Sequence, residues 1–289
     1  MSVARLAKGA RGRVQVRSRQ ALAHARAKSD RTVNCPPAEG IGLGNMLYFL
    51  LWAHAGRRAG LNWRVRSTSG IGRWCEVFPR LEGLLVEPED VAFLDHRVQD
   101  WSQDFHKFPP VALPSFVTER LLPSHALRAR MKDGAASDLT INVRRGDYYS
   151  VPEYRARYGF DIPSYVRDAV QEVRAESAIT RIRVVTDDPG WCRENLCFLE
   201  EVAPVSSWGT SGDALADLAA LASSRRLVLA NSSFSYWGAF LSNGWHGDNH
   251  ALVWTPNFHE RGIYGGLPYH VDPRWHAVEV RDEGGPHHA

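Results

Sequence analysis

The chain has 289 residues, enough for one large domain or two modest ones. Apolar residues make up 44% of it and charged residues 23%, which is typical of a globular protein. Its four cysteines contain no Cys-x-x-Cys pair and no matching histidine pair, which disfavours a zinc site. A disulfide scaffold is not expected at this length, so buried free thiols are predicted.

The charge is uneven along the chain. Residues 1–31 hold nine Lys or Arg and one Asp, a net charge of +8, whereas the remaining 26 basic and 31 acidic residues give −5. We interpret residues 1–31 as a basic tail that either contacts anionic lipid or is a solvated extension. Nucleic-acid binding by the mildly acidic remainder is not expected.

Membrane and export signals are missing from the sequence. No apolar run approaches the roughly 18 residues of a membrane span, and the basic N-terminus has no apolar stretch of the kind found in secretory signals. We therefore expect a cytoplasmic protein, with peripheral contact with the inner membrane face through residues 1–31 as a further possibility.

The first domain is expected over residues 32–137. A glycine-rich turn at 40–45 leads into an apolar helical pattern from Met46 that ends near Gly60, and Asn62–Arg66 follows as a short strand. The rest of this α/β unit and a connection occupy 67–137, where six prolines interrupt the pattern.

A second domain is expected over residues 138–289, where strands and helices alternate. This order predicts a parallel sheet with helices on both faces, and ligands of such sheets bind at the carboxyl ends of the strands. The expected strands are Leu139–Val143, Arg181–Thr186, Leu227–Ala230 and Ala251–Trp254, and the expected helices are Pro163–Glu176, Gly190–Asn195, Gly212–Ser223 and Ser233–Leu241.

The turn at 40–45 fits neither of two familiar phosphate-binding motifs. A dinucleotide fingerprint needs a sixth-position glycine where this chain has Asn45, and a P-loop needs a Gly-Lys-Ser/Thr ending that is absent. Glycines at 42 and 44 indicate either a loop that points amide groups at a ligand or a plain tight turn.

Arg144-Arg145-Gly146-Asp147 directly follows an expected strand. We expect one of the two arginines to point into the crevice, because a guanidinium stays charged and binds phosphate oxygens with a bidentate fork. Asp147 would hold an arginine or contact the ligand. The alternative is a surface cluster of salt bridges.

Two more strand ends carry polar residues. Asp187 and Asp188 are adjacent, so they face different ways and lack the Asp-x-Asp spacing of a metal site; helix capping by one of them is favoured. Asn231-Ser232-Ser233-Phe234 opens a helix and offers amides and hydroxyls to a phosphate, or simply caps that helix. The three strand ends converge on one crevice.

Taken together, these segments resemble the α-1,2-fucosyltransferase family, glycosyltransferase family 11. The matching pieces are Gly42-Leu43-Gly44-Asn45, Val143-Arg144-Arg145-Gly146-Asp147-Tyr148, Thr186-Asp187-Asp188 with Trp191, and the run Ala230–Ala239. The resemblance implies a GT-B-like fold of two Rossmann-like α/β domains facing a cleft. It also implies inverting transfer from GDP-fucose to a galactoside hydroxyl of a glycan or glycolipid, with no metal and no other cofactor.

The resemblance also implies roles for individual residues. Arg144 would contact the pyrophosphate with support from Arg145 and Asp147, and either Asp147 or Glu153 would be the base. Asp217, fifteen residues before Ser232, falls where related enzymes carry a guanine-binding carboxylate. The implied GDP-sugar site comprises Gly44, Asn45, Asn142, Arg144, Arg145, Asp187, Asp217, Ser232, Ser233 and Phe234.

One position departs from the family pattern, which has histidine two residues before the first arginine. Here it is Asn142, which forms hydrogen bonds but does not titrate near neutral pH. Transfer of another sugar from a GDP donor, and non-catalytic binding of a nucleotide sugar or glycan, therefore remain as alternative functions.

Overall fold

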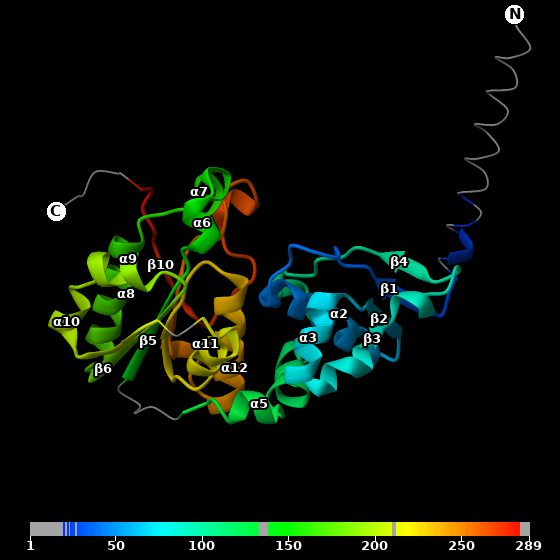
Figure 1. Cartoon of the computed structure of the whole chain (residues 1–289), viewed down its shortest axis with the longest axis horizontal. Coiled ribbons are helices and arrows are strands. Elements are labelled where there is room, and N and C mark those ends of the chain that lie inside the picture. The colour runs from blue at the N-terminus through cyan, green and yellow to red at the C-terminus, as the bar shows by residue number, and fades with distance from the viewer. Residues whose placement is uncertain are drawn as a thin grey trace, which may run out of the picture.

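The computed structural model describes residues 20, 22, 24–26, 28–132, 138–209 and 212–283. They form two lobes that lie side by side, each built on a parallel sheet (Figure 1). In the first lobe the sheet order is β3-β2-β1-β4. Its strands are β1 (Arg31–Asn34), β2 (Asn62–Arg66), β3 (Leu85–Val86) and β4 (His96–Val98).

The second lobe holds a six-stranded parallel sheet in the order β10-β9-β8-β5-β6-β7. Strand order reverses between β5 and β8, which is the arrangement of a doubly wound, Rossmann-like sheet. The strands are β5 (Asp138–Val143), β6 (Arg181–Thr186), β7 (Val205–Trp208), β8 (Arg226–Val228), β9 (Val253–Pro256) and β10 (His276–Val278).

Helices cover both sheets. Those of the first lobe and its connection are α2 (Leu43–Arg58), α3 (Ser69–Val77), α4 (Ala112–Phe116), the π-helix η4 (Val117–Leu121) and α5 (His125–Arg128), with 3₁₀ turns at Pro79–Leu84, Pro88–Asp90 and Phe105–Lys107. Those of the second lobe are α6 (Gly146–Ser150), α7 (Pro152–Tyr158), α8 (Ile162–Glu176), α9 (Pro189–Asn195), α10 (Leu199–Val202), α11 (Ala214–Ala222) and α12 (Ser233–His246), with 3₁₀ turns at His250–Leu252 and Tyr264–Gly266.

The expected α/β class is confirmed, with differences at the ends of some elements. The last helix, α12, runs five residues beyond Leu241 because polar Ser242 and Asn243 are buried and hydrogen-bonded, Ser242 to the Ser224 carbonyl. The edge strand β10 was not predicted, since three residues are too few to form a recognisable pattern. The four cysteines are free thiols as predicted, but only Cys75 and Cys192 are buried, whereas Cys35 is partly exposed and Cys197 is exposed.

The predicted tail 1–31 falls largely outside the described residues, so the proposed lipid contact of the tail stays a prediction. Within the part of the chain that the structure describes, no helix is long and apolar enough to cross a bilayer.

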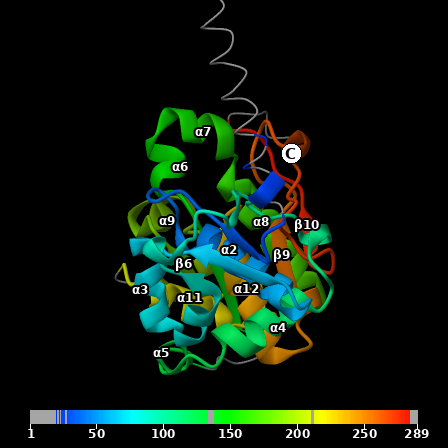
Figure 2. The same ribbon diagram turned by 90° about the vertical axis from the view of Figure 1, so that its right-hand side faces the viewer.

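The two lobes meet where α12 packs against α2 (Figure 2). Indole Nε1 of Trp237 donates a 2.8 Å hydrogen bond to the Gly44 carbonyl, and Trp237 also packs on Tyr48 and Phe116. One buried apolar cluster contains residues of both helices. The contact therefore joins the lobes through a shared core rather than through a hinge.

Gly44 is required at this contact by its packing. It lies in the first turn of α2, and a β-carbon there would sit 2.5 Å from Ser233 Oγ and 2.6 Å from the Phe234 amide nitrogen. The glycine thus lets the two helix N-termini approach each other. The sequence predicts either a ligand-binding loop or a plain tight turn here, whereas Gly44 lies in the helix itself.

We predict that Gly44→Ala lowers the free energy of unfolding by about 1–3 kcal/mol, because the helices must separate to admit the methyl group. Urea denaturation measures this change. Gly42→Ala is the matched control: a β-carbon at Gly42 has no heavy atom within 4 Å, so stability should change by no more than about 0.5 kcal/mol. Equal stability of both variants would contradict the tight contact.

Candidate functional site

A cavity of about 680 Å³ lies at the carboxyl ends of β5 and β8, where the strand order reverses, and faces the N-terminus of α2. This is the position at which doubly wound sheets bind their ligands. The structure gathers ten of the twelve sequence-predicted site residues around this cavity: Gly44, Asn45, Asn142, Arg144, Asp147, Asp187, Asp217, Ser232, Ser233 and Phe234.

Arg144 is held at the cavity wall by two carboxylates. Its Nη1 donates a 2.6 Å hydrogen bond to Asp187 Oδ2, and its Nη2 donates one of 2.5 Å to Asp147 Oδ1. The guanidinium remains partly exposed. Gly146 is needed beside it, since a β-carbon there would lie 2.5 Å from Asp187 Oδ2. The arginine is thus fixed in direction while part of it still faces the cavity.

Arg145 was expected in the GDP-sugar site, but in the structure it does not line this cavity. Its guanidinium stacks 3.9 Å from the Trp191 ring centroid and donates to Asp188 Oδ2 at 3.1 Å, on the side of a different cavity. Successive residues leaving a strand point to opposite faces, so the two arginines diverge. Arg145 contributes to the site only through its backbone amide, which donates to Asp187 Oδ1.

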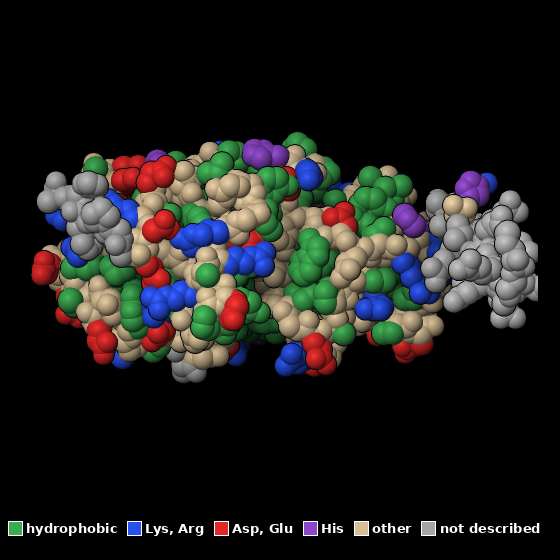
Figure 3. All heavy atoms as spheres, turned by 90° about the horizontal axis from the view of Figure 1, so that it is seen from above, with side chains coloured by type: hydrophobic (Ala, Val, Ile, Leu, Met, Phe, Trp, Pro, Cys, Tyr) green, Lys and Arg blue, Asp and Glu red, His purple; other side chains and the backbone are tan. Residues whose placement is uncertain are grey.

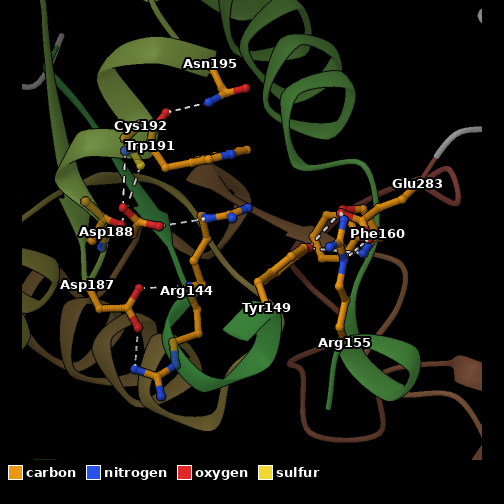
Figure 4. Close-up of polar contacts among 12 residues, drawn as sticks. Arg144, Tyr149, Arg155, Phe160, Asp187, Asp188, Trp191, Cys192, Asn195 and Glu283 are labelled. Carbon is orange, nitrogen blue, oxygen red and sulfur yellow. Dashed lines mark hydrogen bonds and ion pairs between the residues drawn. The ribbon is translucent and has the colours of Figure 1, made fainter. Parts of the chain in front are cut away.

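The two aspartates after β6 point to different sides, as expected (Figure 4). Asp188 caps α9 by accepting a 3.1 Å hydrogen bond from the Trp191 amide, so the predicted capping role is confirmed. Asp187 instead accepts from Arg144 and from the Arg145 amide.

The N-termini of two long helices, α2 and α12, open on the cavity. Neither is capped by a hydrogen bond from its own N-cap side chain. Unpaired amides in a first turn, together with the helix dipole, favour an anion. Asn231 supports this end of α12 by donating to the carbonyls of Tyr158 and His259.

Asn142 and Asp217 lie at the floor and side of the cavity. Asn142 is buried, and its amide donates a 2.9 Å hydrogen bond to the Val185 carbonyl on the neighbouring strand. Asp217 lies in the first turn of α11, and the capping of that helix is done by Asp213. Asp217 is therefore not needed as the cap.

Glu153 does not fit its predicted role as a candidate base, because it is exposed and lines neither cavity between the lobes. The face of α7 that meets the cavity carries Tyr154, Arg157 and Tyr158. These positions are three and four residues apart, which puts them on one side of the helix, whereas Glu153 at the exposed start of α7 lines no part of the cavity.

A second, larger cavity of about 960 Å³ adjoins the first and was missed by the sequence analysis. The two share Asn45, Tyr148, Arg157, Tyr158 and Ser233. Seen from above, apolar side chains gather beside the hollow between the lobes (Figure 3). The aromatic lining of the second cavity comprises Trp52 and Trp63, which stack at 4.2 Å, with Trp101, Phe108, Tyr148, Tyr158, Tyr264 and Tyr269.

Glu260 is the buried carboxylate of this second cavity. Its side chain is 4% exposed, and Oε2 lies 2.5 Å from Arg157 Nε. Burial and Glu260 raise the pKa of the neighbouring Tyr158. Burial likewise raises the pKa of Tyr148 to about 12, so both tyrosines stay protonated at neutral pH. The sequence signal was weak: Glu260 follows the last expected strand in a run without periodicity.

In sequence, residues 124–249 match the family Glycosyl transferase family 11. Galactoside alpha-(1,2)-fucosyltransferase 1 of Lagothrix lagotricha is 27% identical over 115 residues, which are 40% of this chain and 31% of that protein. The enzyme of the same name from Saimiri sciureus is 28% identical over 104 residues, 36% of this chain and 28% of that protein. The chain thus aligns with less than a third of these relatives.

Among solved structures the likeness is weak. E. coli heptosyltransferase WaaC with ADP gives a TM-score of 0.39 at 12% identity, covering 86% of this chain and 93% of that one. POFUT1 in complex with GDP-fucose gives 0.31 at 11% identity, covering 74% and 70%. Scores at this level add no argument about the site.

Two α/β lobes with parallel sheets that face a common cleft define a GT-B-like fold. Residues 124–249, which hold three of the four motifs at this cleft, match the family Glycosyl transferase family 11.

We predict that Arg144→Ala weakens binding of inorganic pyrophosphate roughly 10- to 100-fold, since a hydrogen bond to a charged group contributes about 1.5–3 kcal/mol. Isothermal titration calorimetry measures this. Arg155→Ala serves as control because Arg155 pairs with Glu283 outside the cavity. Unchanged affinity of Arg144→Ala for pyrophosphate would contradict the assignment of Arg144 as an anion-binding residue.

Proposed function

We propose that this protein transfers fucose from GDP-fucose to a galactoside hydroxyl of a glycan, with inversion at the sugar carbon and without a metal. The observation that carries the proposal is the convergence of Arg144 and two uncapped helix N-termini on one cavity at the switch point of the sheet. The family match over residues 124–249 supports the reaction class.

The proposed reaction requires this cavity to stabilise the charge of the leaving group. When the bond between the sugar carbon and the β-phosphate oxygen breaks, the electron pair stays on GDP, so negative charge must be stabilised there. Arg144 has five N–H donors and uses two of them on carboxylates, which leaves others for a phosphate. Asp147 is half exposed and can rotate into solvent when a phosphate arrives.

Metal independence is supported by how the adjacent carboxylates are used. Asp187 is engaged by Arg144 and by the Arg145 amide, and Asp188 by Arg145 and the Trp191 amide. Both carboxylates are therefore committed to protein donors, and Arg144 takes the role of charge stabiliser that a cation fills elsewhere.

The larger cavity fits a saccharide acceptor. Aromatic rings bind the apolar faces of sugars, and polar groups between them orient hydroxyls. The acceptor hydroxyl would attack the sugar carbon from the side opposite GDP, which gives inversion, and its proton would pass to a carboxylate. Glu260 replaces Glu153 as the candidate base, because it is buried in this cavity beside Arg157, which lines both cavities.

The donor is tested by GDP release from GDP-fucose with and without galactoside acceptors. We expect turnover that depends on acceptor. Turnover with GDP-mannose but not GDP-fucose would instead assign another GDP-sugar, a possibility linked to Asn142. Tight GDP-fucose binding without release against any acceptor would indicate a binding protein rather than an enzyme.

We predict that Glu260→Gln lowers kcat about 100-fold or more, since general bases contribute roughly 10²–10⁴. The amide of the variant keeps the size of the side chain but does not take up the proton of the acceptor hydroxyl, so KM for the acceptor should change much less than kcat. Asp100→Asn, at an exposed carboxylate of the same cavity, is the control. A kcat of Glu260→Gln close to that of the wild type would assign the proton transfer elsewhere.

A further inference from the structure

A short chain of hydrogen bonds runs from the buried interior to Asn45, which lines both cavities. Oδ1 of Asn45 accepts a 3.0 Å hydrogen bond from Gln103 Nε2, and Gln103 Oε1 lies 3.1 Å from His270 Nε2. The three residues belong to α2, to the loop after β4 and to the segment between β9 and β10. Their bonds link both lobes at the junction of the cavities.

The position of the proton on His270 determines which group donates in each of these hydrogen bonds. His270 is 1% exposed, and burial, with His259 beside it, lowers its pKa to about 2, so its ring is neutral and carries one N–H. Nδ1 of the ring is buried without a hydrogen-bond partner. A buried unpaired N–H costs more than an unused lone pair, which puts the proton on Nε2.

The proton on His270 Nε2 fixes the orientation of the Gln103 amide, and through it that of the Asn45 amide. Because His270 Nε2 donates, Gln103 must present its oxygen to the ring and its NH₂ group to Asn45. Asn45 then accepts through Oδ1 and turns its own NH₂ group away from Gln103. Around it lie the first turns of α2 and α12.

We propose that Gln103 and His270 are positioning residues that hold the two amide N–H groups of Asn45 toward the junction, where they bind a phosphate oxygen of the donor. The inference rests on the proposed function for the identity of the donor. It adds a neutral pair of donors to a cavity where Asp147 and Asp187 offset the charge of Arg144. Asn45 thereby contributes attraction to an anion without adding another ion pair.

The test uses GDP binding by isothermal titration calorimetry, which is independent of transfer activity. Asn45→Ala removes the donors and should weaken GDP binding roughly 10-fold. Gln103→Glu cannot donate to Asn45, so the Asn45 amide should reverse and present its oxygen to the phosphate. We expect a larger loss in Gln103→Glu than in Asn45→Ala, with both variants melting near the wild-type temperature.

The double variant separates reversal of the amide from the added negative charge. If the proposal holds, Gln103→Glu has little further effect on GDP affinity in the Asn45→Ala background. An equal loss in both backgrounds would reduce the effect to charge alone and overturn the proposal. Nitrogen-15 NMR of the histidine rings gives a second test. A proton on Nδ1 of His270 would reverse donor and acceptor in each of these hydrogen bonds and would also refute the proposal.

If GDP-fucose is not turned over while GDP binding still follows this pattern, the proposed function fails and the positioning role stands. If GDP does not bind to the wild type at all, both fail together.

Discussion

The approach of two helix N-termini across the lobe boundary is the constraint on which the rest of the structure depends. Gly44 leaves room for Ser233 and the Phe234 amide, and Trp237 ties α12 to the Gly44 carbonyl. This packing brings the positive ends of both helix dipoles to one cavity. Neither lobe alone forms the anion site, because each supplies one of the two helices.

The side chains around that cavity are oriented mainly by other side chains. Asp187 holds Arg144 and the backbone of Arg145, Asn231 anchors the segments that carry Tyr158 and His259, and Gln103 directs Asn45. Supporting contacts of this kind reduce the freedom that a ligand would otherwise have to restrict on binding. The larger cavity shares five of its lining residues with the smaller one, so molecules bound in the two would meet over the same surface.

The parts of the fold and site that the sequence predicted are local. Three of the four site motifs follow a buried strand of the second sheet, so their place at the edge of that sheet could be inferred before the structure was known. The residue pattern alone does not say which arginine faces the cavity, and only the family resemblance pointed to Arg144, because the choice depends on how the chain leaves β5 and on Trp191, 46 residues beyond Arg145. The second cavity was hidden for the same reason. Its walls come from α2, the loop after β4 and the segment after β9, whose approach is set by tertiary packing, and the ten tryptophans gave no hint of where they would gather.

The apolar cluster shared by α2 and α12 has a consequence for how such a protein diversifies. Where lobes are joined by a flexible linker, one can be replaced by that of a relative without disturbing the other. Here the inner face of the first lobe and α12 bury their side chains in a common core, so a foreign first lobe would leave voids or overlaps against Trp237 and Phe240. The larger cavity is therefore easier to reshape at exposed positions of the loops after β4 and β9, such as Asp100 and Tyr264, than by recombining whole lobes.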